Sequence, residues 1–205
     1  MQSSEKGILY VSVQHNGPTV SFSSHVKQEK LQDGTSESIG SQEANSSIFL
    51  EVEVARMEHL QAAKTLAEKH KYELGFINQA ILRNAIEANS LLVVPLLVDT
   101  AKLEPIAVQT KAAVAGFVHF YVRRDSVVTL YSIVVAETYR YVGIGRRLFE
   151  ELVSVATARG KTEIRLKCPA ELTANTFYER LGLRVSCVET GKHRPLNVWT
   201  YTIGK

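Results

Sequence analysis

The sequence contains only two cysteines, Cys168 and Cys187. Two cysteines are too few for a disulfide framework, and their scarcity fits a reducing compartment. The first twenty residues lack a long apolar region followed by small residues, so we expect no secretory signal. The most apolar stretch, Leu91 to Val98, is interrupted by Pro95 and is far shorter than the ~20 residues needed to span a bilayer. These absences predict a cytoplasmic protein without a membrane span.

Charge and metal ligands are also scarce. The net charge of +3 is too small and too dispersed to indicate binding to nucleic acid or to a membrane. His59 and His70 are separated by more than the i, i+4 spacing of paired metal ligands, and no CxxC motif accompanies them. We therefore expect no metal.

Serine is unevenly distributed along the chain. Eleven of the sixteen serines precede Ile48, in a segment also rich in Gln, Glu, Gly and Asn, a composition typical of polar segments without a packed core. Within it, ILYVSV and TVSFSS flank the turn-forming HNGP, which predicts a short hairpin over residues 8 to 24, followed by a linker. We predict a polar extension at 1–47 without chemistry of its own, and one folded domain at 48–205.

Strand and helix patterns alternate from Ile48 onward. IFLEVEVARM predicts a strand, and a helix should follow whose apolar face comprises Met57, Leu60, Ala63, Leu66 and Ala67. A second helix is predicted from Ile77 to Ala88, after a break at Gly75. Three strands come next, LLVVPLLVD, AVAGFVHFYV and VVTLYSIVV. The short polar link at 123–126 predicts that the last two pair antiparallel.

A glycine-containing loop, AETYRYVGIG, joins the third of these strands to a predicted helix from about Gly143 to Arg159. That helix should bury a stripe consisting of Ile144, Leu148, Leu152 and Val155, and should end at Gly160. Strand TEIRLKC, a short helix around Leu172 to Leu181 that stops at Gly182, and strands LRVSCVE and NVWTYTI complete the chain. The predicted order is βααβββαβαββ, an α/β (α+β) fold.

The loop from Arg140 to Gly145 has the features of a phosphate site. Because it joins a strand to the start of a helix, it directs main-chain N–H groups and the positive helix end toward one point. Gly143 and Gly145 permit close approach of the backbone, and Arg140 and Arg146 add charge. The third glycine of the dinucleotide fingerprint is absent, and GKT at 160–162 lacks the earlier glycine of a P-loop.

RYVGIG resembles the RxxGxG loop of the GNAT (Gcn5-related N-acetyltransferase) superfamily. VTLYSIVVAETYRYVGIGRRLFEEL resembles that family's central strand, coenzyme A loop and helix, and ANTFYERLGLR resembles its second signature. The resemblance extends over nearly all of 48–203 and implies a mixed, mostly antiparallel central sheet flanked by helices, with acetyl-coenzyme A as cosubstrate. The implied coenzyme contacts are Tyr141, Val142, Gly143, Ile144, Gly145 and Arg146 at the pyrophosphate and Ile133, Val134 and Val135 along the pantetheine.

Acyl transfer to an amine needs a donor for the oxyanion, an acid for sulfur and a base for the amine. Tyr178 matches the family's tyrosine and is the candidate acid, because a phenol with a pKa of about 10 is protonated and can hydrogen-bond a departing thiolate. The alternative is a tyrosine that only packs in the core. By spacing, Glu171, Asn175 and Tyr178 share one helix face. Family members often carry an asparagine that contacts coenzyme A, and by spacing from Tyr178 its position is occupied by Glu171 in this sequence. Asn175 is therefore the candidate for that contact.

The base is less clearly indicated, because residues 126–136 contain no carboxylate where family members often place a glutamate. Ser132 occupies that position and could order a water that relays the proton, unless the amine arrives neutral. His119, on the adjoining strand, is the other candidate base, against the alternative of a satisfied strand residue. Cys168 follows Lys167 at a strand end, but no histidine is linked to it, so packing is favoured over a nucleophile.

The resemblance places the acceptor between KHKYELGF and GKHRPLN. Candidate contacts are Tyr72, Glu73 and Phe76 from the first segment and His193 and Arg194 from the second. The basic second segment suits a carboxylate, a phosphate or an acidic peptide, or is a solvated turn. We expect the acceptor to be a small-molecule or peptide amine and not a nucleic acid, because no RNA-binding motif is present. The sequence is also compatible with a homodimer.

We therefore predict an N-acetyltransferase that moves an acetyl group to a primary amine by direct attack, without a covalent enzyme intermediate. The alternative is a noncatalytic acyl-coenzyme A sensor or interaction module, which the missing strand carboxylate and the serine-rich extension favour.

Overall fold

The computed structural model describes residues 9–14, 17–22, 51–96 and 113–204. The chain divides into two compact units, residues 1–49 and 50–205. In the first unit, β1 (Leu9–Gln14) and β2 (Gly17–Phe22) pair antiparallel, with Val11 opposite Val20. The predicted linker and residues 97–99 of the strand LLVVPLLVD lie outside the described residues.

A seven-stranded sheet forms the centre of the second unit, in the order β3-β4-β5-β6-β7-β9-β8. The strands are β3 (Glu53–Val54), β4 (Leu91–Leu96), β5 (Ala113–Val122), β6 (Val127–Val135), β7 (Glu163–Pro169), β8 (Arg184–Thr190) and β9 (Pro195–Thr202). All neighbours are antiparallel except β6 and β7. The mixed, mostly antiparallel sheet predicted from the sequence is confirmed, including the antiparallel pair β5 and β6.

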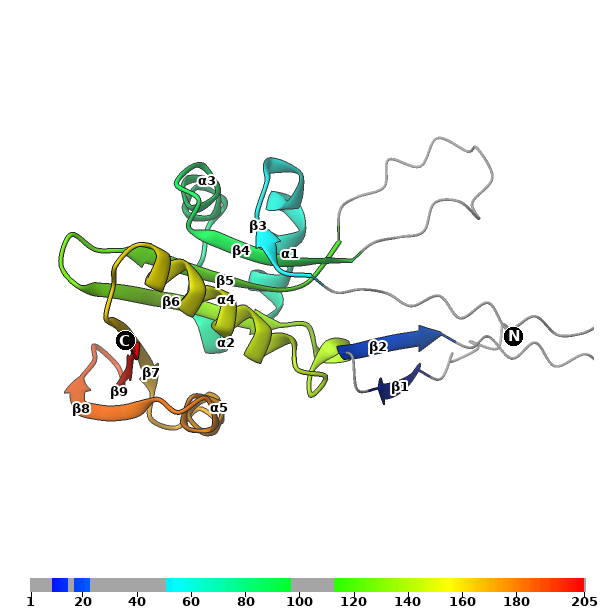
Figure 1. Cartoon of the computed structure of the whole chain (residues 1–205). Helices are drawn as coiled ribbons and strands as arrows, with labels where there is room; N and C mark the ends of the chain where they lie inside the picture. Colours follow the sequence, from blue (N-terminus) through cyan, green and yellow to red (C-terminus); the bar gives the residue numbers. More distant parts are fainter. Residues whose placement is uncertain (1–8, 15–16, 23–50, 97–112, 205) are drawn as a thin grey trace, which may run out of the picture. The chain divides into compact units, whose positions relative to one another are not determined.

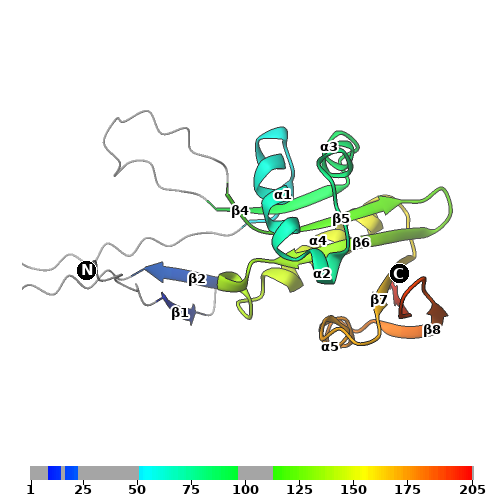
Figure 2. The same cartoon turned by 180° about the vertical axis from the view of Figure 1, so that it is seen from behind.

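Helices cover both faces of this sheet (Figure 1). The helices are α1 (Leu60–Lys69), the single-turn α2 (Lys71–Leu74), α3 (Gln79–Glu87), α4 (Ile144–Ala158) and α5 (Ala174–Arg180). α4 lies in front of the sheet in Figure 1 and behind it in Figure 2, where α1, α2 and α3 are in front. The core under α1 and α3 includes Leu66, Leu82, Phe117 and Val134. None of the described helices is both long and apolar enough to cross a bilayer.

Several local predictions need correction. Met57 is half exposed and belongs to a short 3-10 turn (Met57–His59), so the buried face of α1 consists of Leu60, Ala63, Leu66 and Ala67. Only two residues of the predicted IFLEVEVARM strand pair in the sheet, as β3. On α4 the buried stripe continues through Phe149 and Ala156 rather than Val155, which is only partly buried. The breaks at Gly75 and Gly182 are present, both with positive φ.

β6 and β7 are parallel neighbours that part after a short contact. They pair only where Val127–Thr129 meets Glu163–Arg165, although β6 continues to Val135 and β7 to Pro169. Both views show β7 and the β8–β9 hairpin turned away from β6 (Figures 1 and 2). Beyond Thr129, the edge of β6 that faces β7 therefore has no strand partner among the described residues, and we call this edge the open edge of β6.

Candidate active site

The glycine loop lies at the end of the open edge of β6 and begins α4. Tyr141 and Gly143 both have positive φ, of 66° and 91°, and a Cβ at Gly143 would meet nothing within 4 Å. The first main-chain bond of the helix runs from the Arg147 N–H to the Gly143 carbonyl, at 3.0 Å. The N–H groups of residues 144–146 precede that bond, so they are available to an anion at the positive end of the helix.

The packing of α4 against α5 also requires a small residue at Gly145. A Cβ there would lie 3.1 Å from the ring of Phe177 on α5, so its missing side chain permits α4 and α5 to meet. Arg146 is also directed toward α5, because its Nη2 donates to the Arg180 carbonyl at 3.4 Å and its Nη1 lies 3.9 Å from Glu150. These contacts hold the beginning of α4 against α5.

Arg140 folds back onto the protein. Its Nε donates to the Val135 carbonyl, the last residue of β6, at 3.1 Å. Its Nη2 lies 3.3 Å from Nδ1 of the buried His70, between α1 and α2. Because a guanidinium only donates, Nδ1 of His70 accepts this hydrogen bond. Arg140 thus connects the glycine loop to the α1–α2 junction.

A β-bulge at Tyr131 interrupts the ladder between β5 and β6. His119 pairs with Ser132 and Phe120 with Leu130, so Tyr131 has no partner on β5 and is 58% exposed. Its ring lies 5.1 Å from the His119 ring, centroid to centroid. Nothing in the sequence marks Tyr131 as a bulge residue, because an inserted strand residue leaves no signature in an apolar run.

The candidate bases His119 and Ser132 are direct cross-strand partners and so lie on one face of the sheet. Two residues along, the pair Phe117 and Val134 belongs to the core under α1 and α3. Because strand side chains alternate with a period of two, His119 and Ser132 lie on that same face. Burial lowers the pKa of His119, which keeps its imidazole neutral near pH 7.

Ser132 is buried, and its Oγ makes no hydrogen bond to any of the described residues. Buried hydroxyls in folded proteins are nearly always hydrogen-bonded, so such an oxygen calls for an explanation. A partner that binds from outside the chain would provide one. The Ser132 hydroxyl is therefore available to an acceptor, a water or a cosubstrate.

Tyr178 is buried on α5, with its ring 6.1 Å from that of Trp199 and 5.5 Å from that of Phe177, measured between centroids. Burial, with a smaller effect from Cys168, raises the pKa of the Tyr178 phenol. The phenol therefore holds its proton at neutral pH and can donate it. Cys168 is also buried, and its thiol contacts its neighbour's carbonyl, Pro169 O, at 3.6 Å.

The side-chain amide of Asn175 is fully engaged inside the protein. Its Oδ1 accepts hydrogen bonds from Trp199 Nε1 at 2.8 Å and Asn197 Nδ2 at 3.0 Å. Its Nδ2 donates to three carbonyls of the turn before α5, those of Pro169, Ala170 and Leu172. Since an indole N–H only donates, this amide orientation is required. Glu171 lies in the same turn, before α5 begins, so it does not share a helix face with Asn175 and Tyr178.

On the acceptor side, Arg194 of the second predicted segment contacts Tyr72 of the first and Glu171 in the turn before α5. Its Nη1 lies 2.8 Å from Glu171 Oε1, its Nη2 donates to the Tyr72 carbonyl at 3.4 Å, and its guanidinium lies 5.5 Å from the centroid of the Tyr72 ring. Phe76 is 86% exposed, and His193 is exposed. Glu73 lies 3.9 Å from His70 Nδ1.

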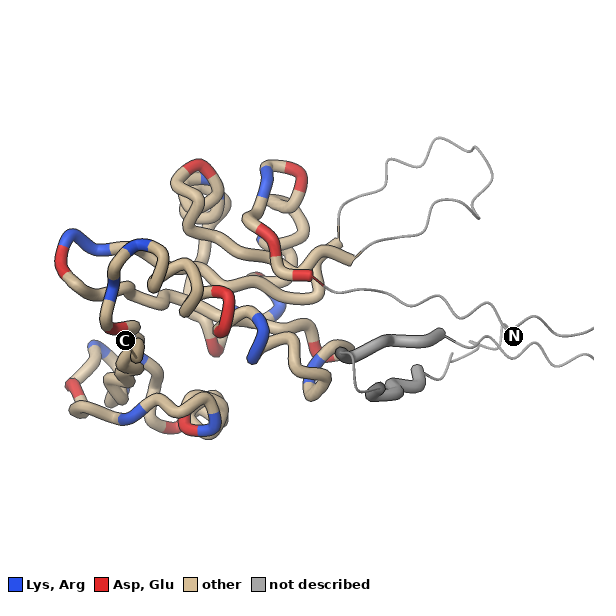
Figure 3. The backbone as a smooth tube through the Cα atoms, in the orientation of Figure 1, with Lys and Arg blue, Asp and Glu red and all other residues tan. Residues whose placement is uncertain are grey.

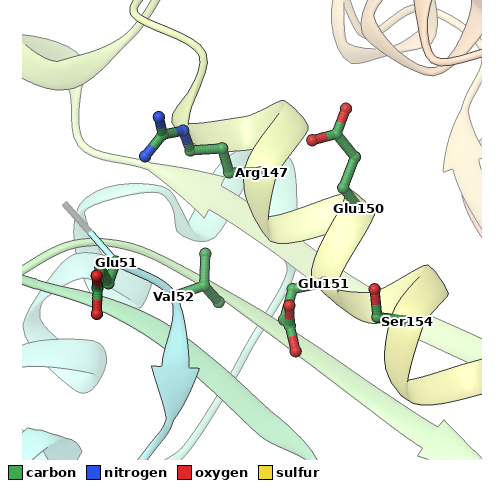
Figure 4. Close-up of a pocket in the computed structure, with 6 residues that line it drawn as sticks. All are labelled: Glu51, Val52, Arg147, Glu150, Glu151 and Ser154. Atoms are coloured by element: carbon green, nitrogen blue, oxygen red, sulfur yellow. The ribbon is translucent and has the colours of Figure 1, made fainter. Parts of the chain in front are cut away.

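Other surface features lie apart from these residues. A pocket between residues 51–52 and the outward side of α4 contains none of the predicted site residues (Figure 4); it is lined by Glu51, Val52, Arg147, Glu150, Glu151 and Ser154. Basic and acidic positions are mixed along the described trace (Figure 3). Arg123, for example, pairs with Asp125 at 2.9 Å. The described residues include no cluster of three metal-binding side chains.

Comparisons with known proteins agree with this architecture. The model of the acetyltransferase (GNAT) family matches residues 77–183. The solved structure of Ard1 from Thermoplasma volcanium is similar with a TM-score of 0.61 at 14% identity, covering 76% of this chain and 98% of that one. The ribosomal-protein-S18-alanine N-acetyltransferase of Escherichia coli gives 0.59 at 19% identity, covering 77% and 96%.

A third solved structure, an aminoglycoside 6′-N-acetyltransferase complexed with coenzyme A, gives a TM-score of 0.59 at 16% identity, covering 76% of this chain and 98% of that one. At these identities the structural likeness establishes a common fold. A comparison with curated protein sequences found no match.

Proposed function

The chain belongs to the acetyltransferase (GNAT) family, and from this premise we propose that it transfers an acetyl group from acetyl-coenzyme A to a primary amine by direct attack. The observation that carries the proposal is the open edge of β6 that ends in the glycine loop. An unpaired strand edge can bind an extended partner through main-chain hydrogen bonds. A helix beginning binds phosphate, so one continuous surface suits the amide-containing arm and pyrophosphate of coenzyme A.

The residues of this surface fit that cosubstrate. Ile133, Val134 and Val135 belong to the open edge and would lie along the pantetheine. Residues 141–146 would hold the pyrophosphate with their main-chain N–H groups, and a Cβ-free Gly143 leaves open space in front of the loop. Arg140 supports the loop from behind through Val135 and His70. We assign it positioning of the loop, together with a long-range attraction for phosphate.

Bound acetyl-coenzyme A supplies an activated thioester whose sulfur leaves with a negative charge. The Tyr178 phenol is protonated at neutral pH, and burial moves its pKa further from neutrality; we assign it donation of its proton to the departing sulfur. Neutral His119 can accept a proton from the amine, and the unbonded Ser132 hydroxyl can orient a water between them. Asn175, with its amide satisfied internally, is assigned positioning of α5 instead of coenzyme contact.

The acceptor, on this proposal, approaches from the face that carries His119 and Ser132. Tyr72, Glu73 and Phe76 from the α2 region and His193 and Arg194 from the β8–β9 turn are the proposed contacts. The exposed rings of Tyr72 and Phe76 can cover the apolar part of a small molecule or peptide. Aromatic side chains provide large contact areas at a low entropic cost.

The test is release of free thiol from acetyl-coenzyme A over a panel of primary amines, with mass analysis of the acetylated product. Amine-dependent thiol release together with an N-acetyl product supports the proposal. Tight binding of coenzyme A without thiol release for any amine would instead support a noncatalytic acyl-coenzyme A sensor. That second candidate is favoured by one observation, the absence of any carboxylate on β6.

A further inference from the structure

Arg194 contacts two separate segments of the chain on the acceptor side, one through Tyr72 and one through Glu171. It comes from the β8–β9 turn, Tyr72 comes from α2, and Glu171 comes from the turn between β7 and α5. The guanidinium contacts one oxygen of Glu171 at 2.8 Å, the Tyr72 carbonyl at 3.4 Å and the face of the Tyr72 ring. A guanidinium has five N–H groups, and the described residues engage two of them.

The turn that carries Glu171 is held against α5, the helix of Tyr178, because Asn175 Nδ2 donates to the carbonyls of Ala170 and Leu172 on either side of Glu171. Burial is the main cause that raises the pKa of the Cys168 thiol; the charge of Glu171 raises it further, and the charge of Arg194 lowers it. Cys168 in turn raises the pKa of Tyr178, after the larger effect of burial.

The contact between Glu171 and Arg194 can also be exchanged for a contact with another carboxylate. The side chains of Arg194 and Glu171 are 31% and 46% exposed, and exposed ion pairs add little to stability because water and salt screen them. The contact uses one carboxylate oxygen, whereas a guanidinium binds a carboxylate best through two parallel hydrogen bonds. An incoming carboxylate could therefore replace Glu171 without leaving Arg194 unpaired, and it would gain the two-point contact.

We infer that Arg194 is a specificity residue that binds a carboxylate of the acceptor, and that Glu171 occupies this guanidinium until the acceptor arrives. The favoured substrates are then amines that carry a carboxylate, such as amino acids or peptides with an acidic group. This inference rests on the proposed function and narrows its acceptor class. The guanidinium lies over the ring of Tyr72, 5.5 Å from its centroid, which helps to hold it in place.

The experiment compares kcat/KM for carboxylate-bearing amines with their carboxamides, using α-amino acids, ω-amino acids of increasing length and short peptides. For each variant, kcat/KM for the acid is divided by kcat/KM for its carboxamide, and this ratio is divided by the same ratio in the wild type. The second division cancels the intrinsic reactivity of each amine. Arg194→Gln should lower the ratio about 10- to 100-fold, the range for a lost charge-assisted hydrogen bond. Glu171→Gln should raise kcat/KM for the acids and leave the amides unchanged, because it removes the competing carboxylate.

Arg184→Gln is the matched control, since it removes the same charge from an exposed position at the other end of the β8–β9 hairpin, and its ratio should stay at the wild-type value. An unchanged ratio in Arg194→Gln, with the wild type acetylating amines, overturns the inference and leaves the proposed function standing. Equal losses for acids and amides in both Arg194→Gln and Glu171→Gln also overturn it, because the pair then only holds the turns together.

Two further outcomes are decisive. If Arg194→Gln fails to fold, Glu171→Gln decides alone, since a rise for acids supports the inference and the absence of a rise contradicts it. If the wild type releases no thiol with any amine while binding coenzyme A, the proposed function fails and the inference fails with it.

Discussion

The indole Nε1 of Trp199 on β9 donates a 2.8 Å hydrogen bond to Oδ1 of Asn175 on α5. This bond connects the strand next to β7 with the helix that carries Tyr178. The same amide donates to carbonyls in the turn that follows β7. Asn175 thus ties three segments together and holds α5, the helix that carries Tyr178, against β9.

Replacing Asn175 with Ala should therefore destabilise the domain. The change leaves the Trp199 indole N–H and several carbonyls without their partner, and we expect a loss of about 2 to 4 kcal/mol in the free energy of unfolding. Chemical denaturation measures it. Asn84→Ala, at an exposed position of α3, is the control and should change stability by about 0.5 kcal/mol or less. Equal effects of the two substitutions would contradict the positioning role.

Ser132 and Ser90 are both buried, but replacing each with Ala should affect stability differently. The Ser90 hydroxyl donates to the Ala85 carbonyl at 3.1 Å, whereas Ser132 Oγ has no partner among the described residues. Ser90→Ala should cost about 1 kcal/mol of stability, and Ser132→Ala should be neutral or stabilising. If the Ser132 hydroxyl orients a water, Ser132→Ala should still lower kcat by at least about tenfold. A stable variant with unchanged kcat would remove Ser132 from the mechanism.

Substitution of Gly143 should weaken coenzyme binding through the backbone. Gly143 and Gly160 both have positive φ, 91° and 66°, and a Cβ at either position would meet nothing within 4 Å. Ala at each should cost about 1 to 2 kcal/mol of stability through left-handed strain alone. Only Gly143→Ala should reduce the affinity for coenzyme A, measured by titration calorimetry, because Gly160 lies at the opposite end of α4. Equal affinities in both variants would argue against the glycine loop as the phosphate site.

Tyr178→Phe should lower kcat by about 100-fold or more while coenzyme A still binds, because the phenylalanine ring fills the same space but carries no proton. Tyr201→Phe is the control, since the ring of Tyr201 packs edge-on against Phe149 at 5.3 Å and is assigned no role in catalysis. Steady-state thiol release and calorimetry give the two quantities. Full activity in Tyr178→Phe would assign the acid role to another group.

Stability should fall as the pH rises above about 9. Burial, together with the charge of Glu171, raises the pKa of the Cys168 thiol from 9.0 to about 11, and the pKa of Tyr178 is also raised by burial. Both groups release their protons more readily in the unfolded chain, so this contribution is complete below pH 9 and is lost as the pH rises toward the folded-state values.

The free energy of unfolding measured between pH 7 and 11 should therefore decline less steeply in Cys168→Ala than in the wild type. Cys187→Ala, at an exposed position of β8, should reproduce the wild-type slope because that thiol is hydrated in both states. Parallel curves for Cys168→Ala and the wild type would contradict the effect of burial on Cys168.

Local patterns in the sequence were sufficient for the framework. The branched and aromatic residues of VVTLYSIVV and the short turn before it predict β6 and its antiparallel pairing with β5, because a few polar residues can join only antiparallel strands. Glycines followed by an apolar helical stripe predict the phosphate loop and α4. These features depend on interactions between residues close in the chain, so the fold class and the family could be predicted from the sequence alone.

Tertiary structure decided which side chains meet. Glu171 and Arg194 are far apart in the chain, and their ion pair exists because β7 and β9 are sheet neighbours. The Asn175 amide finds Trp199 for the same reason, and the parting of β6 from β7 creates the open edge. The bulge at Tyr131 and the exposure of Met57 likewise depend on how strands and helices pack. Such contacts are set by the assembled sheet, whose geometry no local pattern encodes.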